Sequence, residues 1–195
     1  MDRDFTIGFS TSKGLISAML RWLMNSKISH VYGSWKIHQD IRMVVGMESG
    51  GLDWRPMRKF NKTNELKYVF KPIGGKLDDP AILEEMLDAF AQEYANKEYA
   101  FSVMPLLFIM SILGRLGGFG KWIRSKIHGC LSSLSLKLFG TEKEVCCSAY
   151  IELLQSADYP CVAHLKSHEN DTQELLTALM GSDKWIIVYD SGSDK

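Results

Sequence analysis

The chain has 195 residues, of which 46% are hydrophobic and 24% are charged, as in an ordinary globular domain with a sizeable core. Lys and Arg together number 23, as do Asp and Glu, and this balance argues against a dedicated nucleic-acid-binding protein, which carries a basic excess. No apolar run of the signal-peptide kind follows the polar N-terminus, and the stretch 101–113 is shorter than the roughly 20 residues of a spanning helix, so we expect a cytoplasmic protein without a transmembrane segment.

Strands are expected mainly in the first half of the chain. Apolar and β-branched runs, several of them bounded by turn residues, predict strands at 5–9, 28–35, 41–48 and 66–73, with a short amphipathic helix at 15–24. Ser49-Gly50-Gly51 ends the third of these strands. The first half therefore predicts an antiparallel sheet.

Helices dominate the second half. Pro80 suits the first turn of a helix whose apolar residues recur at helical spacing to Phe90. Further helices are expected at 145–157 and 172–180, and a last strand at 185–189. The apolar and basic segment 100–140 resembles an insertion within a single domain spanning 1–195. We therefore expect an α+β fold in which an antiparallel sheet packs against helices.

The four cysteines are Cys130, Cys146, Cys147 and Cys161. They lack the paired CxxC spacing of zinc sites, and the adjacent Cys146 and Cys147 are poor disulfide partners on geometric grounds. We expect reduced thiols, no metal and no cofactor, with one thiol available for chemistry.

Cys147 is the candidate nucleophile. On a helical wheel Cys146 falls on the apolar face of Ala149, Tyr150 and Leu153, whereas Cys147 lies on its flank, where a cleft could open. A cysteine in an apolar helix is more often a small buried hydrophobe. The run 141–144 fits a capping box, and a helix starting there would place the cysteines beyond the first turn, with little benefit from the helix dipole.

His30, in the expected strand 28–35, is the candidate base. Glu48 ends the neighbouring strand, and a carboxylate there would orient the imidazole and stabilise the imidazolium. Asp40 and Asp53 are alternatives to Glu48. A histidine bonded to a backbone carbonyl and a solvated carboxylate at a strand end are the simpler readings of these residues.

These motifs, in this order, resemble those of the permuted papain-like amidases, the YiiX-like branch of the NlpC-type cysteine peptidase superfamily. The similarity rests on Ser29-His30-Val31, then 47–51 (Met-Glu-Ser-Gly-Gly), then Cys147-Ser148-Ala149-Tyr150, and a closing helix and strand. The Gly-Asp-Leu motif frequent at the family's first strand is replaced by Thr6-Ile7-Gly8-Phe9.

The resemblance implies a circularly permuted papain-like fold and a Cys147/His30/Glu48 triad that cleaves an amide or peptide bond, for example in peptides of the cell-wall type. The Cys147 backbone N–H would stabilise the oxyanion, and Tyr32 and Ser148 would lie beside the substrate. The expected partner is a small amide or peptide.

Two alternatives keep this fold. One is a lipid-directed thiol acyltransferase or phospholipase of the lecithin:retinol acyltransferase-like type, for which the basic amphipathic stretch 119–138 would contact an anionic membrane surface. The other is a non-catalytic binding module. No nucleic-acid partner is expected.

Overall fold

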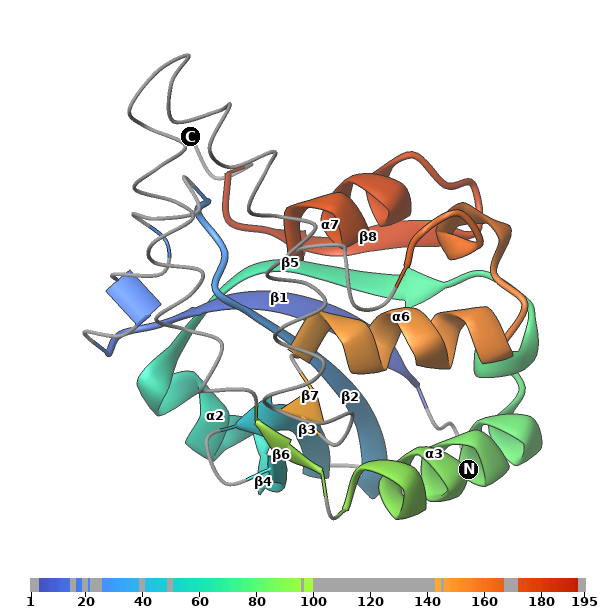
Figure 1. Cartoon of the computed structure of the whole chain (residues 1–195), viewed down its shortest axis with the longest axis horizontal. Coiled ribbons are helices and arrows are strands. Elements are labelled where there is room, and N and C mark those ends of the chain that lie inside the picture. The colour runs from blue at the N-terminus through green and yellow to red at the C-terminus, as the bar shows by residue number, and fades with distance from the viewer. Residues whose placement is uncertain are drawn as a thin grey trace, which may run out of the picture.

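A six-stranded antiparallel sheet lies at the centre of the computed structural model, with the strand order β4-β3-β2-β1-β5-β8 (Figure 1). The structure describes residues 4–14, 17–18, 21, 26–38, 41–48, 51–95, 97–99, 143–144, 146–166 and 172–192. The strands are β1 (Thr6–Ser12), β2 (His30–His38), β3 (Ile41–Glu48), β4 (Gly51–Pro56), β5 (Asn64–Pro72) and β8 (Trp185–Asp190). A separate parallel pair joins β6 (Glu98–Tyr99) to β7 (Lys143–Glu144).

Four α-helices are present in the described part of the chain. They are α2 (Met57–Thr63), α3 (Pro80–Tyr94), α6 (Cys146–Ser156) and α7 (Thr172–Met180). Short 3-10 turns, η1 (Lys76–Asp78) and η3 (Pro160–Val162), precede α3 and follow α6. None of the helices among these residues is long and apolar enough to cross a membrane.

The two faces of the sheet are covered differently. Alternation along β2 sends Val31 and Trp35 into the main core, which they share with apolar residues of α3, α6 and α7. On the opposite face Tyr32 packs in a second, smaller cluster with Phe60 of α2. Helices α3, α6 and α7 therefore lie on one side of the sheet and α2 on the other.

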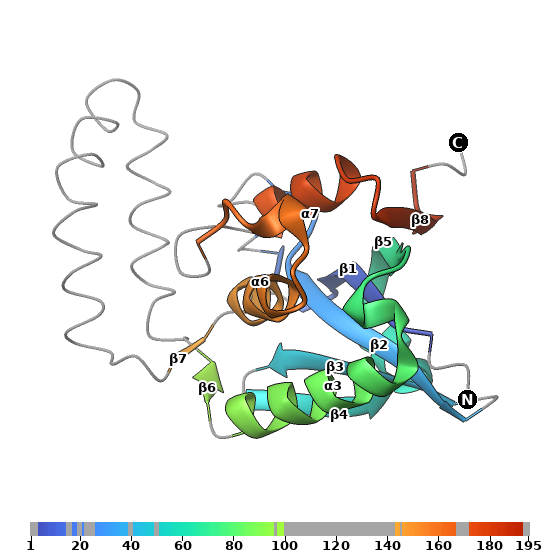
Figure 2. The same cartoon turned by 90° about the vertical axis from the view of Figure 1, so that its right-hand side faces the viewer.

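Helix α6 is the central helix of the larger layer. Figure 2 looks nearly along its axis, with α7 above it and α3 below it. The hydroxyl of Tyr94 in α3 donates to Glu152 of α6 and ties these two helices together. Because neighbours surround α6 on several sides, residues 147–151 are all buried.

The expected α+β class with an antiparallel sheet is confirmed. The bounds of β3 and α7 agree with the sequence prediction, and those of α6 differ by one residue at each end. The sequence did not predict β4 or α2. The expected helix at 15–24 falls largely, and the segment 100–140 entirely, outside the described residues.

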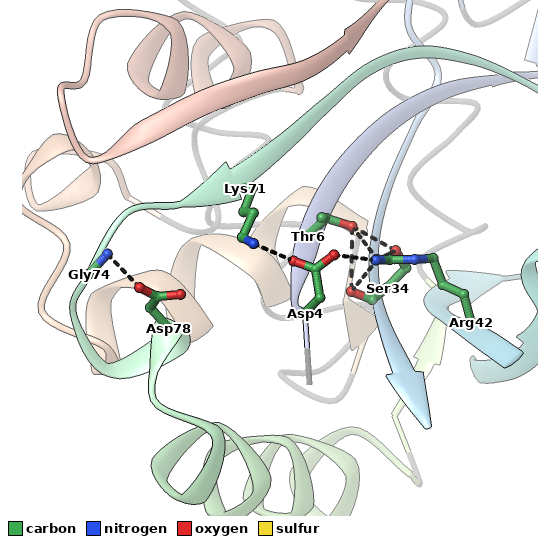
Figure 3. A network of polar contacts seen from close by, with 7 residues as sticks. All are labelled: Asp4, Thr6, Ser34, Arg42, Lys71, Gly74 and Asp78. Carbon is green, nitrogen blue, oxygen red and sulfur yellow. Dashed lines mark hydrogen bonds and ion pairs between the residues drawn. The ribbon is translucent and has the colours of Figure 1, made fainter. Parts of the chain in front are cut away.

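Charged side chains tie the start of β1 to its neighbours at one end of the sheet. Figure 3 shows the Asp4 carboxylate between Arg42 and Lys71, at 2.7 Å from an Arg42 Nη and 2.9 Å from the Lys71 Nζ. The other Arg42 Nη donates to the hydroxyls of Thr6 and Ser34. This network therefore links β1, β2, β3 and β5.

Candidate functional site

Cys147 lies in the first turn of α6, because the helix begins at Cys146 and not at the capping-box residues. Residues 143–144 form β7 instead. Backbone N–H groups of a first helical turn stabilise a nearby thiolate. The position of Cys147 along the helix is therefore that expected of a nucleophile.

The thiol of Cys147 is buried in the main core rather than open to a cleft. Only 5% of the residue is exposed, and it belongs to the same cluster as Val31 and Tyr150. Ser148 beside it is also buried. The side chain of Cys146 lies outside the described part of the structure.

Tyr150, one helical turn after Cys147, docks α6 onto the sheet. Its hydroxyl accepts a hydrogen bond from the Gly33 N–H of β2 at 2.5 Å and donates to the Val45 carbonyl of β3 at 2.6 Å. Helix α6 thus rests directly on the strand that His30 begins.

The imidazole of His30 lies on the other face of the sheet, under α2. Its ring centroid is 6.1 Å from that of Phe60, and its Nε2 lies 2.8 Å from the point where a Cβ on Gly46 would stand. Gly46 and Tyr32 share this face, since they are adjacent across β2 and β3. In this structure the backbone layer of β2 and β3 therefore separates the imidazole from the core that holds Cys147.

Burial controls the protonation of His30. The pKa of its imidazole is lowered to about 4: the loss of hydration is the largest cause, the Arg55 guanidinium adds to it, and the Asp53 carboxylate partly opposes both. The imidazole is therefore neutral at pH 7, and in this buried site it resists protonation.

The two carboxylate candidates within the described residues both lie near His30 in the sheet. Glu48 is the last residue of β3, and the β2–β3 register, extended by three residue pairs from Gly33–Val45, places its position opposite His30. The side chain of Glu48 is outside the described part. Asp53 lies on β4 opposite Gly46 and pairs with Arg55. Asp40 is outside the described residues.

Tyr32 shares the face of His30, as strand alternation predicts. Its hydroxyl is buried and has no hydrogen-bond partner among the described residues, and burial raises its pKa. The ring packs against that of Phe60 in a tilted arrangement, with a centroid distance of 4.6 Å. Tyr32 therefore points away from α6 and from Cys147.

A surface groove of about 420 Å³ lies between α3 and α6. Phe90, Met86 and Leu153 are among its apolar lining, and three glutamates contribute carboxylates. Neither Cys147 nor His30 belongs to the lining. The described residues also contain no group of three His, Cys, Asp or Glu side chains placed to hold a metal ion.

Sequence reasoning missed Gly46, Arg55 and Phe60 as parts of this region, and it named Tyr150 only as an apolar-face and motif residue without predicting its contact with β2 and β3. Gly46 carried a usable signal, because a glycine inside an apolar strand frequently marks a close approach by another group. The stretch 119–138, considered for membrane contact, lies outside the described residues.

Comparisons with protein-family models, with curated proteins and with solved structures found no match to this chain. The described residues form an α+β fold, in which one antiparallel sheet carries helices on both faces.

Proposed function

We propose that this chain is a cysteine hydrolase of amide or peptide bonds, built on a circularly permuted papain-like fold. Cys147 is the nucleophile, His30 the base and Glu48 the group that orients the base. The observation that carries the proposal is the position of Cys147 in the first turn of α6, docked by Tyr150 onto the strand that His30 begins.

An N-terminal helical turn favours the thiolate over the thiol. In its buried site the His30 imidazole, with a pKa of about 4, is a weak base, so the proposal requires this pKa to rise before the imidazole takes the Cys147 proton. The Glu48 position, opposite His30 by extension of the register, suits a carboxylate that stabilises the imidazolium.

The proposal requires the imidazole of His30 to reach the α6 side of the sheet. His30 is the first residue of β2 and is paired with Ser10 of β1, whereas the described pairs between β2 and β3 begin only at Gly33. A turn at the start of β2 would therefore leave the β2–β3 ladder intact, but it would break the pairing of His30 with Ser10. We propose that this rearrangement precedes catalysis.

The chemistry then follows the order of a thiol hydrolase. His30 takes the Cys147 proton, and the thiolate attacks the carbonyl carbon of the amide. The Cys147 backbone N–H stabilises the oxyanion. Collapse of the tetrahedral intermediate breaks the C–N bond, the imidazolium gives its proton to the leaving amine, and water hydrolyses the thioester.

Alkylation by iodoacetamide, followed residue by residue by peptide mass spectrometry between pH 5 and 9, tests this proposal. We expect Cys147 to react faster than glutathione near neutral pH, and His30→Asn to remove that advantage. The half-buried Cys161, whose pKa burial raises, is an internal reference. The exposed His164 supplies the matched control, His164→Asn.

Equal alkylation rates in the wild type and in His30→Asn, or an unreactive Cys147 in the folded protein, would overturn the proposal. Hydrolysis of a panel of chromogenic peptide amides gives the second readout. We expect Cys147→Ala to abolish any turnover that the wild type shows, and unchanged turnover would equally refute the assignment.

A further inference from the structure

The hydroxyl of Tyr150 occupies an unusual place in the sheet. It accepts from the Gly33 N–H and donates to the Val45 carbonyl, and Gly33 and Val45 are partners in the β2–β3 register. These are the two backbone groups that a hydrogen-bonded antiparallel pair joins directly. A side chain of α6 therefore takes part in the ladder between β2 and β3.

This contact falls where the two strands part. From Lys36–Arg42 the pairing runs as far as Gly33–Val45, and no further pair forms among the described residues towards His30. Both His30 and Glu48 thus lie beyond the last pair, at the open end of the two strands. The Tyr150 hydroxyl marks the point of divergence.

The surroundings of Tyr150 hold its ring in one place. A Cβ added to Gly33 would lie 3.0 Å from both Cε1 and the hydroxyl oxygen of Tyr150, so the ring rests directly on the glycine backbone. On the helix side the ring packs against Phe90 of α3, with centroids 5.6 Å apart. The residue is fully buried.

We propose that Tyr150 is a positioning residue, which holds the first turn of α6, and with it the Cys147 thiol, over the point where β2 and β3 separate. This inference rests on the proposed function, since it gives Cys147 a catalytic role. Tyr150 acts through the backbone and does not touch the reacting atoms. Its hydroxyl fixes the helix against the strand that brings the base.

Tyr150→Phe tests the inference, because it keeps the buried ring and removes only the hydroxyl. Tyr159→Phe is the matched control: Tyr159 is also buried, its hydroxyl donates to the Gly74 carbonyl at 3.0 Å, and its ring packs on Trp185. Each variant loses a tyrosine hydroxyl that donates to a backbone carbonyl, in a buried hydrogen bond for Tyr150 and a partly buried one for Tyr159. Of these two hydroxyls, that of Tyr150 joins α6 to β2 and β3, whereas that of Tyr159 bonds to Gly74.

Two readouts separate positioning from general stability. Hydrogen exchange of the Gly33 amide, measured by NMR, is expected to accelerate about tenfold in Tyr150→Phe, because its acceptor is lost. The midpoint of the Cys147 alkylation profile is expected to move towards the pH of an ordinary thiol. Neither quantity should change in Tyr159→Phe.

The outcomes distinguish the inference from the proposed function. Faster Gly33 exchange with an unaltered Cys147 profile would overturn the positioning role, as would the same profile shift in both variants. A wild-type Cys147 that is no more reactive than glutathione would refute the proposed function, and Gly33 exchange would then still decide whether the hydroxyl secures the ladder. If Tyr150→Phe does not fold, Gly33→Ala, which pushes the ring away, must shift the Cys147 profile in the same direction.

Discussion

The absence of a side chain at position 46 leaves room for the His30 imidazole on the α2 side of the sheet. A methyl group on Gly46 would stand 2.8 Å from Nε2, closer than such contacts occur, and 3.3 Å from Cε1, which is a tight contact. The ring fills the space that the glycine leaves, between β3 and Phe60. A small residue in one strand thus creates the dry environment that keeps the neighbouring imidazole neutral.

That environment makes stability depend on pH. The folded pKa of His30, about 4, lies below the unfolded value of 6.5, so between these values the unfolded chain binds more protons. The stability associated with the neutral, buried imidazole is fully present above pH 6.5 and is lost as the pH falls towards 4. It amounts to roughly 3 kcal/mol.

Urea unfolding at pH 7.5 and at pH 5 measures this effect. We expect the wild type to lose more of its unfolding free energy over this interval than His30→Asn, which has no imidazole to protonate. His164→Asn should behave as the wild type, since His164 is exposed. If all three proteins lose the same unfolding free energy between pH 7.5 and pH 5, the burial of His30 is not the cause of the pH dependence.

At the scale of secondary-structure elements, the short helix α2 acts as a cover for one face of the sheet. Phe60 is its buried residue and contacts both Tyr32 and His30. Phe60 of α2 therefore contributes to the burial that lowers the pKa of His30.

We expect Phe60→Leu to raise the pKa of His30 towards 6.5, because rehydration favours the charged form. The variant should also lose about 1–3 kcal/mol of stability through imperfect packing. An NMR titration of the imidazole gives the first quantity and urea unfolding the second.

Phe9→Leu is the matched control for this experiment. Phe9 is equally buried but packs in the main core, on the opposite face, against Phe70. Phe9→Leu should lower the free energy of unfolding by a similar amount and leave the pKa of His30 unchanged. A shift of equal size in both variants would show that the pKa responds to general loosening and not to α2.

Elements with one clear apolar pattern were predictable from sequence, and those without it were not. β3 and α7 have apolar residues at strand or helical spacing, and their bounds agree with the prediction. β4 buries only Gly51, at its first position, and α2 buries only Phe60. Such segments carry too little apolar periodicity to be recognised.

The candidate site shows the same limit. Alternation correctly placed Tyr32 on the face of His30, but no pattern indicates which face of the sheet α6 covers. The helical wheel placed Cys147 at the edge of one buried face, whereas the sheet, α3 and α7 enclose α6 on several sides. Cys147 is consequently a core residue in this structure.

At the scale of the whole molecule, the Asp4 network joins four strands at one end of the sheet (Figure 3). Burial alone would raise the pKa of Asp4, but the hydrogen bonds and charges of Lys71 and Arg42 outweigh it and hold the pKa below 3.8. The resulting stabilisation is present above pH 3.8 and is lost as the pH falls through the lowered pKa.

Asp4→Asn should therefore lower stability at pH 7 and flatten the acid end of the stability profile. Circular dichroism melts between pH 2 and 7 measure both effects. Asp88→Asn, at an exposed position of α3, should leave the profile as in the wild type. If the stability of Asp4→Asn falls with decreasing pH as steeply as that of the wild type, the Asp4 network is not the cause of that fall.

The strand order also has a consequence for biosynthesis. Strand β5 is paired on one edge by β1 and on the other by β8, and 113 positions (185 − 72) separate the end of β5 from the start of β8. At 5–20 residues per second a ribosome needs on the order of ten seconds to cover that distance. During this interval the backbone groups along that edge of β5 lack the strand that pairs with them among the described residues, and an unpaired edge is a template for misassembly with neighbouring chains. A chaperone that binds extended segments would find its target there, between the synthesis of Pro72 and that of Trp185.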